Sequence, residues 1–469
     1  MIRIREIELR RAELKTRMPF RYGIAVLTAA PHAFVVAEAE IDGVVQRGIT
    51  ADHLPLKWLT KDPDRDPADE IVDMIDVIHH AVGFARELSA PTVFEFWEKL
   101  YRAQAAWGKA AGYPPLLYHF GTSLVERALI DAFCRRQGKP FHELLRSNAF
   151  GMDLGRLFPE LRGTAPADWL PPQPLDSVAC RHTVGLADAL TDEEIPAADV
   201  LHDGLPQSLV ACIHHYGLRQ FKIKFTADRA ASIPRLRRIA AILERETRGD
   251  YAASLDGNES FHHVKDFRGY WAQAKALPEL QGLFQRLLFV EQPFHRQIAL
   301  GAEVREGMSG WPERPLIIID ESDAEIESLP QALACGYAGT SHKNCKGVFH
   351  GVANACLLAR RRRDGLPGFM SGEDLTNIGP VSLPQDLAVQ AALGNESVER
   401  NGHHYFRGLS FWPEAIQREA LAHHGDLYRR SPQGWPTLAV EKGRIQLGSV
   451  NRAPFGIATI PVVAGFQPF

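Results

Sequence analysis

Apolar and polar residues follow two different rhythms in the first 147 residues of the chain. Over about the first 50 residues, apolar side chains tend to fall at every second position, as in a half-buried strand, and Asp42-Gly43 supplies a hairpin turn. Pro19 and Gly23 interrupt this pattern, so a loop is expected over 19–25. From about 68 to 147, apolar residues recur at intervals of three and four, as on one face of a helix. The pattern predicts a three-stranded sheet followed by helices, an α+β domain.

A second pattern, in which short apolar segments alternate with helical ones, runs from about 177 to 410. Eight strands alternating with helices in this span predict a closed parallel (β/α)8 barrel of the α/β class. The alternative is an open doubly wound sheet, but no GxGxxG follows the first strand to indicate dinucleotide binding. The expected strands contain, in order, SVACRHTVG, QFKIKF, AASLDGN, RLLFVEQP, LIIIDES, YAGTSHKN, GFMSGED and HHYFRGLS.

These patterns divide the 469 residues into four parts. Residues 1–147 form the α+β domain, and 148–176, rich in Pro and Gly, form a linker or insertion. Residues 177–410 form the barrel. The remaining segment, 411–469, is too short for a third domain, so we expect it to pack back on the first one.

Composition and charge argue against several classes of function. The net charge is −4 at pH 7, which favours neither nucleic acid nor an anionic membrane as a partner. No stretch approaches the roughly 18 apolar residues that a membrane-spanning helix needs, and the first residues do not resemble a signal peptide. The six cysteines form no CxxC pair and lie in apparent core segments, as expected for reduced thiols. We therefore expect a cytoplasmic protein that acts on a small molecule.

Charged residues recur at the carboxyl ends of the expected barrel strands, about one β/α unit apart. These ends face the active site of such a barrel, so we expect the charged side chains to meet there. Strand alternation places both lysines of the second strand on one face, with Ile223 on the other. The residues are Lys222 and Lys224 on the second strand, Asp256 on the third, Glu291 on the fourth, Asp320 on the fifth and Lys343 on the sixth.

Three carboxylates from neighbouring strands would repel one another unless a cation lies between them. All-oxygen ligation suits Mg²⁺. A metal with a lysine on each side fits the removal of a proton from the carbon next to a carboxylate. The metal binds that carboxylate and stabilises the growing negative charge, while one neutral lysine takes the proton and the other can return it.

The same motifs resemble those of the enolase superfamily, in its muconate-lactonizing and mandelate-racemase branch. KIK at 222–224 resembles the family's KxK motif, and LDGN, VEQP and IDES resemble its three metal-ligand segments. HKNCKG resembles its sixth-strand lysine motif, and MPFRYG and the 50–60 loop resemble its two capping loops. The resemblance covers nearly the whole chain. It implies a modified TIM-like barrel with an N-terminal α+β capping domain that the C-terminal tail completes, in a homo-oligomer.

The resemblance also implies roles for individual residues. Asp256, Glu291 and Asp320 would bind Mg²⁺, with Asn258 and Glu321 as their neighbours. Lys224 and Lys343 would be acid/base groups on opposite faces of the substrate, and Lys222 would lower the pKa of Lys224 and contact the substrate carboxylate. Further candidates for substrate contact are Glu373 at the end of the seventh strand and Phe20, Tyr22 and Lys57 in the capping loops.

Two departures from the family pattern bear on the reaction. Lys346-Gly347-Val348 stands where the family has Gly-Gly after the sixth-strand lysine, which makes Lys346 a rival of Lys343. No seventh-strand His is placed for a His–Asp dyad.

We expect an isomerase, either a racemase or epimerase or a cycloisomerase, that forms an enediolate from a small carboxylic acid. One alternative is a lyase, an acid-sugar dehydratase of the same superfamily. Others are a barrel lysine that forms a Schiff base and a non-catalytic relative.

Overall fold

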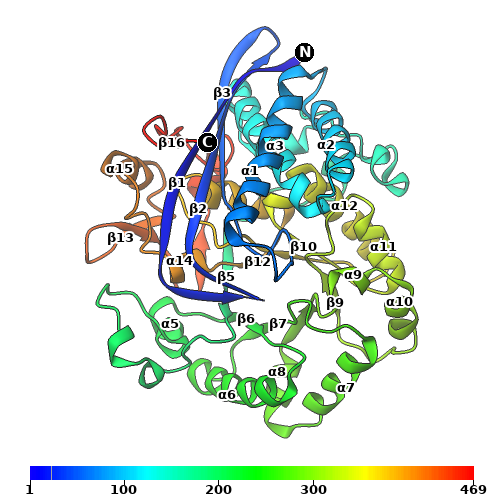
Figure 1. Ribbon diagram of the computed structural model, residues 1–469, viewed down its shortest axis with the longest axis vertical. Helices are drawn as coiled ribbons and strands as arrows, with labels where there is room; N and C mark the ends of the chain where they lie inside the picture. Colours follow the sequence, from blue (N-terminus) through cyan, green and yellow to red (C-terminus); the bar gives the residue numbers. More distant parts are fainter. Residues whose placement is uncertain (23) are drawn as a thin grey trace.

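Eight parallel strands close into a barrel at the centre of the molecule. Each pairs with the next along the chain, and the eighth pairs with the first, with Glu399 opposite Arg181. The computed structural model describes residues 1–22 and 24–469, except the side chains of Tyr22, Ala25 and Ala30 (Figure 1). The predicted (β/α)8 fold is confirmed. The strands are β5 (Ser177–Val184), β6 (Gln220–Lys224), β7 (Ala252–Asp256), β8 (Leu287–Glu291), β9 (Ile317–Ile319), β10 (Gly339–His342), β11 (Phe369–Gly372) and β12 (Ser397–Glu399).

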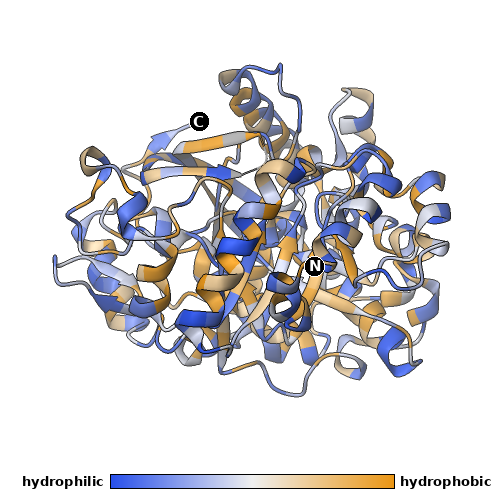
Figure 2. Cartoon of the chain, turned by 90° about the horizontal axis from the view of Figure 1, so that it is seen from below, coloured by the Kyte–Doolittle hydropathy of each residue, from blue (hydrophilic) through white to orange (hydrophobic). Residues whose placement is uncertain are grey.

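Helices follow these strands and cover the outside of the barrel (Figure 1). In the first of these helices, α5 (Leu209–Tyr216), the Ser208 side chain accepts a hydrogen bond from the backbone N–H of Ala211, and Gly217 ends the helix at a φ of 65°. Hydrophobic segments gather toward the interior of the molecule and hydrophilic ones toward the periphery (Figure 2). The helices are α5 (Leu209–Tyr216), α6 (Arg229–Thr247), α7 (Val264–Lys275), α8 (Gln281–Gln285), α9 (Arg296–Ala299), α10 (Ala302–Ser309), α11 (Ser328–Cys335), α12 (Val348–Arg363) and α13 (Ser382–Leu393).

The eighth barrel strand lies earlier in the chain than the sequence pattern predicts. The stretch HHYFRGLS is not a strand, because its first residues belong to the short helix α14 (Gly402–Tyr405). His403, His404 and Tyr405 are all buried, so the apolar character of this stretch reflects a packed helical turn. The true eighth strand, β12, has three residues, which are too few to show a period.

Three long antiparallel strands form the sheet of the first domain, as predicted. They are β1 (Ile2–Tyr22), β2 (Ala25–Ile41) and β3 (Val44–His53), and two short strands, β4 (Ser89–Ala90) and β16 (Gln467–Pro468), pair with β1. The prediction of a loop over 19–25 is wrong over most of that range, because residues 19–22 belong to β1 and Ala25 begins β2. The pairing of β1 with β2 shifts register between Lys15 and Phe20, which accommodates Pro19 within this two-stranded ribbon. The β1–β2 ribbon can therefore reach the barrel (Figure 1).

The helices of the first domain pack on one face of this sheet. The central helix, α3, is buried along almost its whole length and lies against β3. At this contact the fully buried side chains of Arg127 and Asp52 form an ion pair of 2.8 Å. The close approach also needs a glycine, because a Cβ on Gly48 would lie 2.3 Å from the carbonyl oxygen of Ala128. The helices are α1 (Pro67–Glu87), α2 (Val93–Ala110), α3 (Pro115–Gln137) and α4 (Phe141–Arg146).

The linker and the C-terminal segment contain short elements. Three 3-10 turns occupy the linker, at Leu154–Arg156, Pro159–Leu161 and Pro166–Asp168. The C-terminal segment contains α15 (Glu414–His423), β13 (Tyr428–Arg430), β14 (Pro436–Leu438), β15 (Arg444–Gln446) and α16 (Gly448–Arg452). It contacts both larger units, because β15 pairs with β5 of the barrel and β16 with β1. The four-part division of the chain stays a proposal.

Among the described residues, no helix combines the length and the apolar character needed to cross a membrane.

The contact between β3 and α3 gives a stability prediction. Gly48→Ala should lower the free energy of unfolding by about 1–3 kcal/mol, because the new methyl group meets rigid backbone atoms. Gly83→Ala is the matched control. Gly83 lies on the exposed side of α1 with open space around its Cβ position, so alanine there should stabilise the helix slightly. Thermal unfolding checks both variants, and equal melting temperatures would contradict the proposed close contact.

Candidate functional site

The two lysines of β6 point into the mouth of the barrel. Lys222 and Lys224 are buried on the inner face, while Ile223 packs in the hydrophobic core. The Nζ of Lys224 donates to an Oδ of Asp256 at 2.5 Å. This arrangement follows from strand alternation, as predicted.

Lys222 lies at the centre of a group of carboxylates. Its Nζ is 2.7 Å from Glu291, 2.8 Å from Glu399, and 3.0 Å from both Asp256 and Glu373. Burial acts to lower the pKa of Lys222, but the surrounding carboxylates outweigh it and hold that pKa well above its usual value. Lys222 is therefore positively charged when no cation is bound, and Asp320 and Glu373 raise the pKa of Lys343 in the same way.

The acids at the ends of β7, β8 and β9 lie side by side because the strands pair in register. Asp256 is the partner of Glu291, and Glu291 is the partner of Ile318, two residues before Asp320. Carboxylate oxygens of Glu291, Asp320 and Glu373 lie within 4.8 Å of one another, so these three side chains could hold a metal ion. Asp256 lies next to this group, because Lys222 forms ion pairs with both Asp256 and Glu291.

Lys343 faces the lysines of β6 from the other side of these acids. Its Nζ donates to Asp320 at 2.6 Å and to Glu373 at 2.8 Å, and it lies 5.1 Å from the centre of the Trp58 ring. Lys346 also lies 3.0 Å from the Asp320 carboxylate, but it donates to the carbonyl oxygens of Asp320 and Ser341 and does not line the cavity. Lys343 is therefore the sixth-strand lysine that faces the site.

A cavity of about 580 Å³, measured with its open mouth, lies above these charged groups. The barrel supplies its polar floor, and the first domain supplies part of an apolar roof. The ribbon contributes Phe20, which also stacks on Tyr405 with ring centres 4.2 Å apart. The lining residues are Phe20, Leu27, His53, Pro55, Trp58, Lys222, Lys224, Asn258, Asp320, Glu321, Lys343, Asp374, Leu375, Thr376, Glu399 and Asn401.

Several buried oxygens in this region have no hydrogen-bond donor among the described residues. They are an Oε of Glu291, an Oε of Glu321 and the Oδ1 of Asn258. Burial and the adjacent Asp256 and Glu373 carboxylates raise the pKa of Glu291 well above its usual value. Leaving buried acceptors unpaired is costly, and a hard divalent cation with oxygen ligands would satisfy them. The residues present therefore fit Mg²⁺.

The structure does not bring every predicted residue to the cavity. Lys57 donates to the carbonyl oxygen of Asp62 at 2.8 Å and lies 3.5 Å from Glu70, so it stabilises its own loop and does not face the site. Glu373 lies beneath the cavity and bridges Lys222 and Lys343, so it is not placed to contact substrate. The side chain of Tyr22 lies outside the described residues.

Two residues at the candidate site are not predicted from the sequence. Glu399 accepts a hydrogen bond from Lys222 at 2.8 Å and lines the cavity, but it ends the short strand that the pattern misplaced. Lys61 donates to the backbone of Asn258 at 2.6 Å and to Glu259 at 2.9 Å. The role of Lys61 is not predicted, because the sequence of a polar loop does not indicate which barrel residues its lysines contact.

The turn that Lys61 contacts follows directly after Asp256. Asn258 and Glu259 have φ angles of 44° and 60°, which non-glycine residues rarely adopt. The backbone N–H of Asn258 donates to the Oδ1 of Asp256 at 2.8 Å, so the turn fixes the orientation of that carboxylate. The capping loop thus stabilises a strained turn beside the candidate metal ligands.

Comparison with known proteins establishes the fold. No protein-family model and no curated protein sequence matches the chain. A mandelate racemase/muconate lactonizing protein from Herpetosiphon aurantiacus is 15% identical, with a TM-score of 0.60 over 96% of this chain and 97% of that one. An enolase from Bradyrhizobium, complexed with magnesium and mandelic acid, is 16% identical, with a TM-score of 0.58 over 97% and 96%. A dipeptide epimerase from Enterococcus faecalis V583, complexed with Mg and L-Leu-L-Tyr, is 16% identical, with a TM-score of 0.59 over 97% and 100%. The chain shares the fold of these proteins, and a further match, from Enterococcus faecalis V583, is described as an unknown member of the enolase superfamily.

Lys61 and Lys57 provide a matched test of this site. Lys61→Met removes the hydrogen bond to the backbone of Asn258 and one of the donors to Glu259, which Arg296 also contacts, so the backbone amides of 256–260 should exchange with deuterium faster. Lys57→Met should leave that segment unchanged, because the contacts of Lys57 in the described part of the chain lie within its own loop and α1. Hydrogen–deuterium exchange with mass spectrometry measures both. Equal exchange of 256–260 in the two variants would show that Lys61 does not stabilise the turn.

Proposed function

We propose that this chain is a Mg²⁺-dependent enzyme that removes a proton from the carbon next to a carboxylate in a small molecule. The observation that carries the proposal is the position of Lys224 and Lys343. Both line one cavity, and in the barrel they flank the three strands that end in Asp256, Glu291 and Asp320. A base on each side of a metal-binding floor is what this chemistry requires.

Asp256, Glu291 and Asp320 are the proposed Mg²⁺ ligands. Glu373 is the geometric rival, because its oxygens, and not those of Asp256, fall in one group with oxygens of Glu291 and Asp320. Asp256 and Glu373 both accept hydrogen bonds from lysines, so the choice of Asp256 rests on its place in the LDGN motif. Glu291, by contrast, keeps an oxygen without a donor. When bound, the ion would neutralise the substrate carboxylate and stabilise the negative charge that grows on it. The structural matches with bound magnesium support this choice of ion.

The chain's own residues would bind the substrate and move its proton. Lys222, a charge fixed by four carboxylates, would contact the substrate carboxylate. One of Lys224 and Lys343 would take the proton, and the other would deliver one from the opposite face. Phe20, Trp58 and other apolar residues of the roof would exclude water and contact the rest of the substrate.

Proton removal on one face and return on the other gives a racemase or epimerase. We favour this isomerase reaction. Cycloisomerisation is the variant in which loss of the proton breaks a ring bond at the neighbouring carbon, or, in the reverse direction, closure of that bond is followed by protonation. The matching dipeptide epimerase and the match complexed with mandelic acid support small carboxylates as the substrate class. An acid-sugar dehydratase is the second candidate within the fold. A Schiff-base lysine enzyme would leave the carboxylates without a role.

The cellular context also stays a proposal. All six cysteines are free and buried, which supports the proposed cytoplasmic location. We retain the homo-oligomer as an expectation from the family resemblance.

The two-base arrangement predicts the outcome of solvent exchange. With a panel of acid sugars, dipeptides and N-acyl amino acids in D₂O, the protein should incorporate deuterium next to the carboxylate of its substrate only when Mg²⁺ is present. Lys224→Ala and Lys343→Ala should each lower turnover by at least about 100-fold. Lys57→Ala, a lysine that does not face the cavity, is the control. Full activity in both barrel variants, or exchange that persists in EDTA, would contradict the mechanism.

The two possible ligand sets predict different orders of Mg²⁺ affinity. Asp256→Asn should weaken Mg²⁺ binding by at least about 10-fold, and by more than Glu373→Gln does, because only Asp256 would be a direct ligand. Isothermal titration calorimetry compares the variants with the wild type. Unchanged affinity in Asp256→Asn would remove this residue from the ligand set, and a larger loss in Glu373→Gln would favour Glu291, Asp320 and Glu373.

A further inference from the structure

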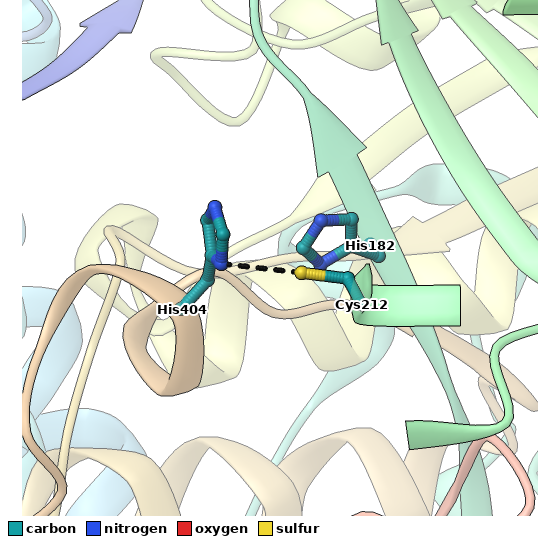
Figure 3. Close-up of side chains that lie close together, drawn as sticks. All are labelled: His182, Cys212 and His404. Atoms are coloured by element: carbon teal, nitrogen blue, oxygen red, sulfur yellow. Dashed lines mark hydrogen bonds between the residues drawn. The ribbon is translucent and has the colours of Figure 1, made fainter. Parts of the chain in front are cut away.

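Two histidines and a cysteine meet on the barrel wall, away from the catalytic cavity. His182 comes from β5, Cys212 from α5 and His404 from α14 (Figure 3). One potential ligand atom of each lies within 4.8 Å of those of the other two. All three side chains are at least 98% buried, and none lines the catalytic cavity.

The donor atoms of this group are poorly satisfied by the protein. The Sγ of Cys212 and the Nδ1 of His404 are 3.4 Å apart, joined by a weak thiol–imidazole contact. The Nδ1 of His182 is buried with no hydrogen-bond partner among the described residues. Most buried polar atoms in proteins are paired, so this nitrogen needs an explanation.

We propose that His182, Cys212 and His404 bind a zinc ion. Mixed nitrogen and sulfur ligands favour zinc over the hard cations that carboxylates bind. With ordinary zinc–nitrogen and zinc–sulfur bond lengths, a tetrahedral site separates these two donors by about 3.6 Å. The observed separation of 3.4 Å is close to this value. On binding, the S–H bond of Cys212 breaks, its proton goes to solvent and a zinc–sulfur bond forms.

The site has a route to solvent and a candidate fourth ligand. His404 also lines a hollow of about 760 Å³, measured with its opening, into which Asp188 and Glu194 face. His403 lies next in the chain, its ring centre is 5.5 Å from that of His182, and both its ring nitrogens lack partners among the described residues. His403 falls outside the group whose ligand atoms all lie within 4.8 Å of one another, so water would take the fourth position.

The position of the site indicates a structural role. His404 lies one residue before Tyr405, whose ring stacks on Phe20 of the ribbon. The backbone oxygen of His404 also accepts a hydrogen bond of 2.9 Å from Arg17 of β1. A metal bound at His404 would therefore fix α14, on which the ribbon rests above the catalytic cavity.

Cobalt is the probe that separates this site from the carboxylates of the catalytic cavity. The reduced, EDTA-treated protein is titrated with Co²⁺ in saturating Mg²⁺, without oxygen. We expect one equivalent to bind with a thiolate-to-cobalt charge-transfer band, which zinc then abolishes, since oxygen ligands cannot give that band. Absence of the band in the wild type would overturn the proposal.

Variants assign the band to its ligand. Cys212→Ser should lose the band, while Cys356→Ser, which changes another buried helical thiol outside the group, should keep it. His404→Gln should weaken cobalt binding by more than about 10-fold, the loss that even an outer partner of a metal site causes. Circular dichroism checks folding, and if Cys212→Ser does not fold, His404→Gln and the wild-type titration decide. An unchanged band in Cys212→Ser, or unchanged affinity in His404→Gln, would contradict the assignment.

Discussion

The crowding of carboxylates at one end of the barrel is the constraint on which the rest of this structure depends. Asp256, Glu291, Asp320 and Glu373 are all buried there, where isolated charges would be strongly destabilising. Lysines neutralise part of this charge, with Lys222 alone contacting four carboxylates. Oxygens that still lack donors are the reason to place a divalent cation among them. Structural stability and the proposed chemistry therefore depend on the same charges.

The first domain completes this end of the barrel. Trp58 covers Lys343, Lys61 holds the turn after Asp256, and Phe20 closes the roof from the ribbon. Each of these contacts places a residue of the first 61 positions against a barrel residue that lies far along the chain. The two units therefore form one site, and a barrel without its cap would leave the acids open to water. Enclosure matters because electrostatic interactions strengthen when water is excluded.

The sequence predicts the parts of this site that follow a repeated pattern. Asp256, Glu291 and Asp320 each come directly after an apolar run, so their places in the barrel can be read from the alternation of strands and helices. Glu399 is missed because its strand has three residues and shows no period. Lys57 and Lys61 cannot be told apart from the sequence, since both lie in one polar loop and only the folded path decides which contacts the barrel. The group of His182, Cys212 and His404 joins three distant segments, and no motif links them.

The central claim is that one divalent cation binds where these acids meet. Crystals soaked in Mn²⁺, examined by anomalous diffraction, test it most directly, because Mn²⁺ shares the oxygen-ligand preference of Mg²⁺ and can be located by its own scattering. We expect one peak at the mouth of the barrel, at about 2.1 Å from carboxylate oxygens of Asp256, Glu291 and Asp320, with Lys224 and Lys343 on either side. The absence of a peak at the barrel mouth, or one bound by other residues, would contradict it.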